Sequence, residues 1–251
     1  MPPNMTTNKG WIVPLVCILI VVAIVYIGHR SANEDERIDK TTDSTPIEEW
    51  PSVQVSKETI KESNKLYDIT VNYPVTKSES ITAYMSDFVK NEIEIFKQNV
   101  TGENELPDGY PSATLNISYE ERKSENANTY LFVIYTDTGG AHGLTVTRTF
   151  SFAKNGERIN IEDLFTNGAQ GLGVIADYVK TELQKKEFAD RNWIAEGAAS
   201  TTENYKSFVI EDSGVTFIFD PYQVAAYAAG TQNVSVPTSV FKRIANPEIF
   251  N

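Results

Sequence analysis

The chain has 251 residues, 41% of them hydrophobic, with 12 Phe and 12 Tyr, which is enough for one or two domains with a core. Its single cysteine, Cys17, lies in an apolar N-terminal segment, so disulfides and thiolate zinc sites are excluded from the rest. The net charge is −12, and it becomes −13 beyond residue 28 because Lys9 is left out. This acidic balance disfavours nucleic acid and anionic lipid as partners.

The first predicted element is a membrane span over residues 11–28, which contain no charged residue. With Gly10 the uncharged stretch has about 19 residues and a helical length of about 28 Å, close to the ~30 Å of bilayer hydrocarbon. We interpret it as an uncleaved signal anchor; the alternative is a cleaved signal peptide, whose apolar stretch is shorter. On this interpretation, the protein crosses the membrane once. Residues 1–10 form a short cytoplasmic tail, and the large C-terminal part is extracytoplasmic.

The next segment, residues 29–50, is rich in Asp, Glu, Ser and Thr and nearly free of apolar residues. Such a composition cannot bury a core, so we expect a flexible acidic tether. The folded part is expected to begin near Val53.

The first half of the folded part predicts strands around one helix. Alternating apolar residues predict a strand over 66–75, and three- and four-residue spacing predicts a helix over 78–100, capped by Ser78 or Ser80. The apolar face of this helix is expected to hold Ile81, Tyr84, Met85, Phe88, Glu92, Ile95 and Phe96. A loop over 102–111 and strands over 113–119, 129–136, 144–153 and 158–161 follow. Asn155-Gly156 indicates a type I′ turn, in which both residues have positive φ.

The second half predicts a helix over 171–188, a loop over 192–202, and a hairpin of strands 205–210 and 215–219. Asp220 and Pro221 then indicate the start of a short helix over 222–229 that ends at Gly230. A strand over 234–236 closes the chain. The predicted fold class is α+β, with antiparallel sheets and packed helices in two tandem units, 52–155 and 156–247, preceded by one transmembrane helix.

The stretch from Tyr135 to Gly143 contains three glycines in five residues between two predicted strands, so it indicates a sharp connection. Its candidate ligand-binding residues are Asp137, Gly139, Gly140, His142 and Gly143. His142 is the only histidine beyond residue 29. It is interpreted as a turn residue, a binding contact or, with Asp137, a catalytic base.

The segment Asp220 to Gly230 combines four alanines with two tyrosines, Tyr222 and Tyr227. Small residues allow close packing of a corner against a sheet. Exposed tyrosines, in contrast, form recognition surfaces, and on this interpretation Tyr222 and Tyr227 bind a ligand.

Catalytic signals are weak in this sequence. One histidine beyond the N-terminal segment excludes a two-histidine metal site there, and no Gly-x-Ser-x-Gly motif is present. The pairs Glu120-Glu121, Glu162-Asp163 and Glu211-Asp212 fall at predicted strand ends and turns, and acidic neighbours are common in an acidic chain. We therefore expect no catalytic residue, no metal and no cofactor.

Three segments together resemble a known ectodomain. Tyr135 to Gly143 is similar to the "YTGGAHG" signature of PdaC-type peptidoglycan deacetylases, with Asp137-Thr138 as an addition to the usual spacing. Residues 156–165 resemble the junction that follows in that family, and residues 220–237 resemble the "pYevapYaaG" end of the companion domain. RsiV-type anti-sigma factors, which bind lysozyme, carry the same tandem outside the membrane.

The resemblance implies a non-enzymatic binding or sensor domain in the cell envelope. Its expected partner is peptidoglycan or a basic wall-targeting protein such as lysozyme, with the lipid bilayer contacted through residues 11–28. The deacetylase domain of PdaC-type enzymes is not found among these residues. The alternatives are an envelope hydrolase, a deacetylase-accessory module, and a structural envelope protein whose partner is another membrane protein.

Overall fold

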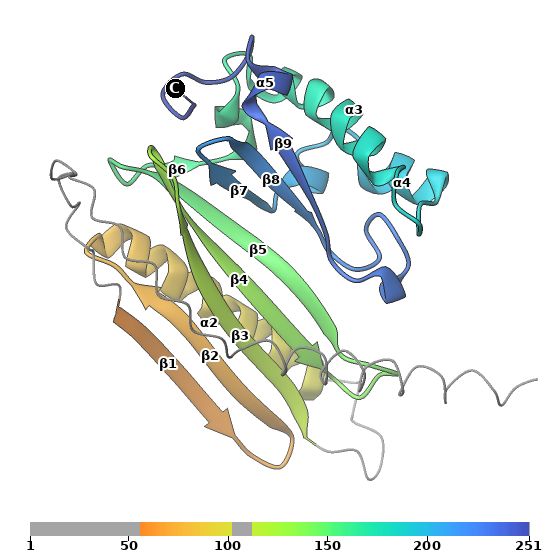
Figure 1. Ribbon diagram of the computed structural model, residues 1–251. Helices are drawn as coiled ribbons and strands as arrows, with labels where there is room; N and C mark the ends of the chain where they lie inside the picture. Colours follow the sequence, from red (N-terminus) through yellow and green to blue (C-terminus); the bar gives the residue numbers. More distant parts are fainter. Residues whose placement is uncertain (1–55, 102–111, 251) are drawn as a thin grey trace, which may run out of the picture. The chain divides into compact units, whose positions relative to one another are not determined.

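The structure is a computed structural model that describes residues 56–101 and 112–250 (Figure 1). Four predicted segments lie outside these residues: the tail at 1–10, the membrane span at 11–28, the tether at 29–50 and the loop at 102–111. Among the helices of the described part, none is both long and apolar enough to cross a membrane. The described residues belong to one compact unit, Ser52–Asn251.

A six-stranded sheet with the order β1-β2-β3-β4-β5-β6 forms the first half of this unit (Figure 1). Its neighbours are antiparallel, except that β2 and β3 are parallel because the helix α2 connects them across one face. The sheet is therefore mixed, which corrects the purely antiparallel prediction. Its elements are β1 (Ser56–Ser63), β2 (Tyr67–Val75), α2 (Glu79–Thr101), β3 (Ala113–Lys123), β4 (Ala127–Asp137), β5 (Leu144–Ala153) and β6 (Arg158–Ile159).

The sequence did not predict β1. Its residues are mostly polar and exposed, and Ile60 is the one hydrophobic side chain of this strand that packs against the core. A strand at the edge of a sheet can form through backbone pairing with its neighbour, here β2, without an alternating apolar pattern.

The predicted helix over 78–100 is confirmed as α2. Ser78 Oγ accepts a hydrogen bond from the N–H of Ile81 at 3.4 Å, as expected of a helix cap. The buried face follows Met85, Val89, Ile93, Phe96 and Val100. The prediction of Ile95 on this face is wrong, because Ile95 is 45% exposed.

The second half holds a three-stranded antiparallel sheet in the order β7-β8-β9. Figure 1 shows α3 on the side of this sheet that faces away from the six-stranded sheet. The predicted hairpin and last strand are confirmed, and the helix predicted over 171–188 is present but ends at Leu183. The elements are α3 (Leu172–Leu183), α4 (Arg191–Gly197), β7 (Phe208–Glu211), β8 (Gly214–Phe219), β9 (Gln232–Pro237) and α5 (Thr238–Phe241), with 3₁₀ turns at Ile161–Leu164, Gly168–Gly171, Glu203–Tyr205 and Tyr227–Ala229.

Three local predictions are wrong. Residues 192–202 were expected to be a loop, but the first of them belong to α4, whose start is capped because Asp190 Oδ1 accepts hydrogen bonds from the N–H groups of Asn192 and Trp193. The helix expected over 222–229 shrinks to a 3₁₀ turn, because Tyr222 has a φ of +71° that no right-handed helix allows. The turn at Gly156 is present, but Tyr222 is the one non-glycine residue of the described part with positive φ, so the type is not I′.

Two hydrophobic clusters form the core of the described part. One lies between α2 and the six-stranded sheet and is rich in edge-to-face aromatic pairs, such as Phe88 with Phe150 at 4.7 Å between ring centroids. The other lies between α3 and the three-stranded sheet and includes the fully buried Tyr205 and Phe217. Each cluster holds one sheet and its helix together.

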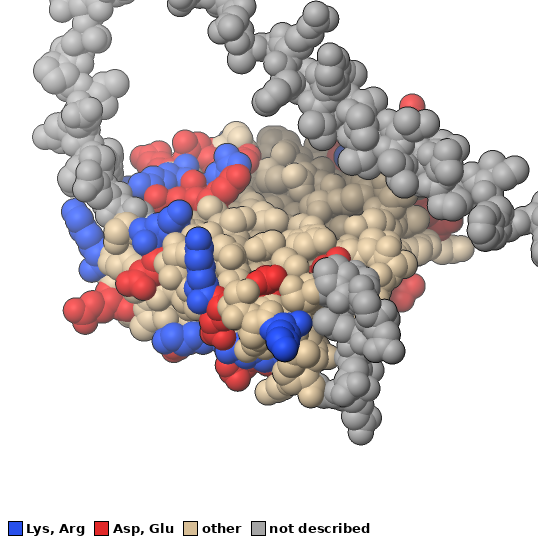
Figure 2. All heavy atoms as spheres, turned by 90° about the horizontal axis from the view of Figure 1, so that it is seen from below, with Lys and Arg blue, Asp and Glu red and all other residues tan. Residues whose placement is uncertain are grey.

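The surface carries charges of both signs. On the face shown in Figure 2, Lys and Arg side chains are interspersed with Asp and Glu side chains. Some form ion pairs, such as Lys97 with Glu62 at 2.8 Å. Ion pairs at the protein surface contribute about 0–1 kcal/mol each, so the mixed surface matters more for solubility than for stability.

Candidate binding site

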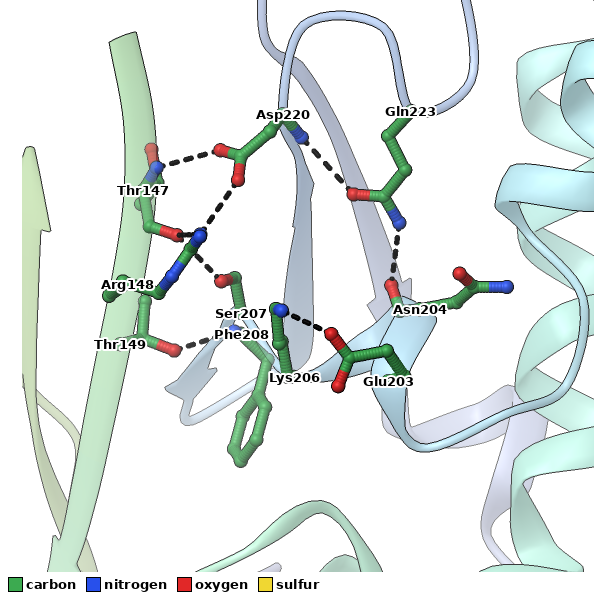
Figure 3. Close-up of polar contacts among 10 residues, drawn as sticks. All are labelled: Thr147, Arg148, Thr149, Glu203, Asn204, Lys206, Ser207, Phe208, Asp220 and Gln223. Carbon is green, nitrogen blue, oxygen red and sulfur yellow. Dashed lines mark hydrogen bonds and ion pairs between the residues drawn. The ribbon is translucent and has the colours of Figure 1, made fainter. Parts of the chain in front are cut away.

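The two sheets meet along a polar seam between β5 and the start of β7 (Figure 3). The N–H of Phe208 donates to Thr149 Oγ1 at 2.8 Å, and Ser207 Oγ donates to the carbonyl oxygen of Thr147 at 2.9 Å. An edge strand such as β7 has N–H groups with no partner in its own sheet, and a buried one is costly if left unpaired. Hydroxyl groups of the first sheet therefore complete the hydrogen bonding of the second.

Asp220 anchors the segment that carries the predicted tyrosines to the same strand, β5 (Figure 3). Its Oδ1 accepts a hydrogen bond from the N–H of Thr147 at 2.7 Å, and its Oδ2 pairs with Arg148 at 2.8 Å. The carboxylate is 18% exposed, so these are strong, charge-assisted contacts. The prediction that Asp220 caps a helix is wrong, because its carboxylate is used to fix the position of this segment.

The glycine motif forms the connection between β4 and β5, and its glycines have different structural roles. Gly139 has a φ of +86°, and its N–H donates to Asp137 Oδ1 at 3.1 Å. A Cβ on Gly143 would lie 2.4 Å from the Tyr135 side chain, whereas one on Gly140 would meet nothing closer than 3.8 Å. Gly139 and Gly143 thus shape the loop, and Asp137 stabilises its first turn.

His142 leaves this loop and stacks on Tyr227, with 3.8 Å between ring centroids and 20° between ring planes. Its Nδ1 lies 3.0 Å from the carbonyl oxygen of Gly143, which also accepts a hydrogen bond from the hydroxyl of Tyr227 at 2.9 Å. The structure therefore brings together the two sequence motifs that were singled out, although 85 positions separate His142 from Tyr227.

Tyr222 extends this stack toward solvent. Its hydroxyl lies 3.3 Å from Nε2 of His142, and its ring centroid lies 5.4 Å from that of Tyr227 and 6.4 Å from that of Trp193. We call His142, Trp193, Tyr222 and Tyr227 the aromatic shelf. Tyr222 is 51% exposed and Trp193 is 36% exposed. An exposed aromatic residue held in the left-handed region is strained, and such strain is concentrated at functional sites.

The sequence missed Trp193, the fourth member of the aromatic shelf. Its signal was present but incomplete: Asp190 is a helix-cap residue, and Asn192-Trp193 follows it within one turn. Asp137, the last residue of β4, and Gly139 and Gly140 in the loop that follows are not part of the stack. Whether any of the predicted residues binds a ligand stays a prediction.

A groove with a volume of about 570 Å³ lies beside the aromatic shelf. Its lining residues, which define it from here on, are Asn192, Trp193, Glu196, Gly197, Asn204, Tyr222 and Gln223. Its volume is within the range of about 300–1,000 Å³ that small-ligand sites have. The groove is thus lined by both α4 and the segment that carries Tyr222.

Side-chain donors bind the carbonyl groups at the C-terminal end of α4. Asn204 Nδ2 donates to the carbonyl oxygen of Glu196 at 2.9 Å, and Gln223 Nε2 donates to that of Gly197 at 3.0 Å. The buried hydroxyl of Tyr205 donates to the carbonyl oxygen of Ala198 at 3.0 Å. Burial raises the pKa of Tyr205, so this hydroxyl stays a neutral donor. Helix ends expose such carbonyl groups, and satisfying them makes this short helix a fixed wall of the groove.

The side chains that were weighed as catalytic candidates make local structural contacts. Both ring nitrogens of His142 contact neutral oxygen atoms, those of Gly143 and Tyr222. The predicted carboxylate pairs are used structurally: Glu121 pairs with Lys123 at 3.2 Å, and Asp212 accepts the N–H of Glu125 at 2.6 Å. Within residues 56–101 and 112–250, no group of three His, Cys, Asp or Glu could hold a metal ion.

Comparison with known sequences identifies one domain. Residues 162–239 match the family described as "Protein of unknown function (DUF3298)". The chain is also 28% identical over 240 residues to the peptidoglycan-N-acetylmuramic acid deacetylase PdaC of Bacillus subtilis, covering 93% of this chain and 50% of PdaC. It is 30% identical over 107 residues to the immunogenic protein MPT64 of Mycobacterium tuberculosis, covering 42% of this chain and 46% of MPT64. The chain thus spans about half the length of these relatives.

Two solved structures share this fold. A DUF3298 family member from Bacteroides fragilis has a TM-score of 0.54 at 15% identity and covers 78% of this chain and 95% of its own. A DUF3298 family protein from Pseudomonas aeruginosa has a TM-score of 0.51 at 13% identity. The alignment covers 78% of this chain and 96% of the Pseudomonas chain. At such identities the likeness extends to the fold alone. Residues 162–239 include α3, α4, the three-stranded sheet, and Trp193, Tyr222 and Tyr227 of the aromatic shelf.

Proposed function

We propose that this protein is a membrane-anchored extracytoplasmic binding domain that recognises a cell-wall component through the aromatic shelf. The observation that carries the proposal is the meeting of the two sequence motifs in one partly exposed stack, in which Tyr222 is strained. Rigid, exposed tyrosine and tryptophan side chains supply binding energy at a low cost in conformational entropy.

The cell wall is proposed as the target because the relative PdaC is named for its action on peptidoglycan. The chain covers half of that enzyme, so recognition of the polymer, rather than its deacetylation, is the part that we carry over. The apolar segment 11–28 and the acidic segment 29–50 would hold the domain at the outer surface of the cell membrane, near the wall. The domain itself is proposed to be non-enzymatic.

A basic wall-targeting protein such as lysozyme is the second candidate ligand. It is favoured by the formal charge of −13 beyond residue 28, since opposite charges steer partners toward each other. The exposed carboxylate of Glu196 beside the aromatic shelf adds to this field.

Co-sedimentation of the full-length chain with purified peptidoglycan sacculi tests the proposal. The chain, kept in solution with mild detergent, should appear in the pellet and leave the amount of released muropeptide at background. Titration with a c-type lysozyme in a calorimeter at two salt concentrations tests the second candidate, for which salt should weaken binding. A chain that stays in the supernatant and binds no lysozyme would refute the proposal, and muropeptide release would favour a hydrolase.

A further inference from the structure

The groove beside the aromatic shelf has an aromatic wall. Among the described residues, Trp193 and Tyr222 are the two aromatic members of the exposed large hydrophobic side chains, and they are neighbours with 33° between ring planes. Both line the groove. An aromatic face that is open to water but adjoined by polar groups suits a ligand with one apolar face and polar edges.

The rest of the lining supplies polar groups that remain available to a ligand. Asn192 and Glu196 lie four residues apart on α4 and are exposed. Within the part of the chain that the structure describes, no hydrogen bond engages the Glu196 carboxylate, the Asn192 carboxamide or Oδ1 of Asn204. Two of these groups are acceptors only, so the groove favours a ligand that is rich in O–H and N–H donors.

The groove is also held in shape before any ligand binds. A Cβ on Gly197 would lie 1.8 Å from the carbonyl oxygen of Gln223, so α4 and the segment of Tyr222 are in direct backbone contact. The side-chain amide of Gln223 donates to the carbonyl oxygen of Gly197 in α4 and to that of Asn204 in the 3₁₀ turn Glu203–Tyr205, so it ties the segment of Tyr222 to both. A preformed site of this kind loses little entropy on binding.

We infer that the groove is a subsite for one uncharged N-acetylated hexose ring of a glycan chain. The ring stacks its apolar face on Trp193 and Tyr222, while its hydroxyl groups donate to Glu196 and Asn204. The acetamido group pairs with the carboxamide of Asn192. Glu196 is the one charged residue of the lining, so it repels an anionic ring and favours a neutral one.

This inference rests on the proposed function, since it names the class of wall component and where that component binds. It adds a ring position that neither motif predicted, because Asn192, Trp193 and Glu196 come from α4. The two can fail separately: sacculi can be bound elsewhere on the aromatic shelf, for example at His142 and Tyr227.

Fluorescence of Trp193 tests the subsite. The other two tryptophans, Trp11 and Trp50, are replaced by phenylalanine in the full-length chain, so that emission reports Trp193 alone. Titration with tri-N-acetylchitotriose should change this emission in a saturable way. Cellotriose, which lacks the acetamido groups, should bind at least about tenfold more weakly.

Variants at the groove and away from it locate the binding. Tyr222→Ala should weaken chitotriose binding by roughly 30-fold, as loss of an interface hot spot does, and Tyr222→Phe should recover most of this loss because it keeps the ring. Glu196→Gln should weaken binding, whereas the matched exposed variant Glu248→Gln, near the C-terminus, should not. Thermal unfolding checks that each variant is folded.

Three results would overturn the inference. Chitotriose that leaves Trp193 emission unchanged, while sacculi still bind the chain, removes the subsite and keeps the proposed function. Binding that survives both Tyr222→Ala and Glu196→Gln places the sugar elsewhere. A chain that binds neither chitotriose nor sacculi refutes the subsite and the proposed function together.

Discussion

Single residues set the geometry of the aromatic shelf, and the glycines behind His142 can be tested one by one. Gly143→Ala should lower the free energy of unfolding by about 1–3 kcal/mol, because the new methyl group would overlap the Tyr135 ring. Gly140→Ala, in open surroundings in the same loop, should change it by less than about 0.5 kcal/mol. Urea unfolding measures both, and equal effects would contradict the close packing of Gly143.

Backbone strain at Tyr222 gives a second prediction at this scale. Tyr222→Asn and Tyr222→Ala both remove the exposed ring, but asparagine tolerates a φ of +71° better than alanine does. The asparagine variant should therefore be more stable by roughly 0.5–1 kcal/mol. Thermal unfolding of the two purified variants measures the difference. An alanine variant that is equally stable would show that the residue has no left-handed conformation in solution.

At the scale of elements, the contact between β5 and β7 depends on hydroxyl acceptors. Thr149→Val keeps the shape of the side chain but leaves the buried N–H of Phe208 without its partner. We expect a loss of about 1–3 kcal/mol in the free energy of unfolding. Thr145→Val, a half-buried position on the same face of β5, serves as the control and should change stability by less than about 0.5 kcal/mol. Equal losses would contradict the role of Thr149.

The helix α2 gives a pH-dependent prediction. Burial raises the pKa of Glu92 above its usual 4.5, and the nearby Arg148 offsets part of this rise. A raised pKa in the folded state means that protonated Glu92 favours folding, so its contribution is complete below about pH 4.5 and is lost as the pH rises through the folded pKa. Glu92→Gln should therefore raise stability at pH 7, with a gain that disappears in acid. Unfolding at pH 4 and pH 7 measures this, and a loss at pH 7 would contradict it.

The sequence predicted elements whose apolar pattern reports burial directly. The alternation of Tyr67 to Val75 identified β2, and the spacing from Ile81 to Phe96 identified α2. It missed β1, which forms through pairing with β2, and α4, whose end is held by distant side chains of Asn204 and Gln223. Both depend on contacts that only the folded chain makes.

The candidate site was predictable only in part. His142 and Tyr227 stood out because of unusual composition, but their stacking over 85 positions follows from the arrangement of the two sheets. The conformation of Tyr222 could not be predicted from the sequence, because Pro221 after Asp220 favours the start of a helix. In the structure, the carboxylate of Asp220 instead binds the N–H of Thr147 and pairs with Arg148. Tertiary contacts thus override the local preference for a helix at the segment that supplies Tyr222 to the aromatic shelf.

At the scale of the whole molecule, we propose that the partly exposed aromatic shelf contacts the cell wall. The most direct test sediments the full-length wild type and Tyr222→Ala side by side with purified sacculi over a range of polymer concentrations. The wild type should move to the pellet, whereas Tyr222→Ala, although folded, should require roughly 30-fold more polymer to do so. Identical sedimentation of the two proteins would contradict the claim that the aromatic shelf recognises the wall.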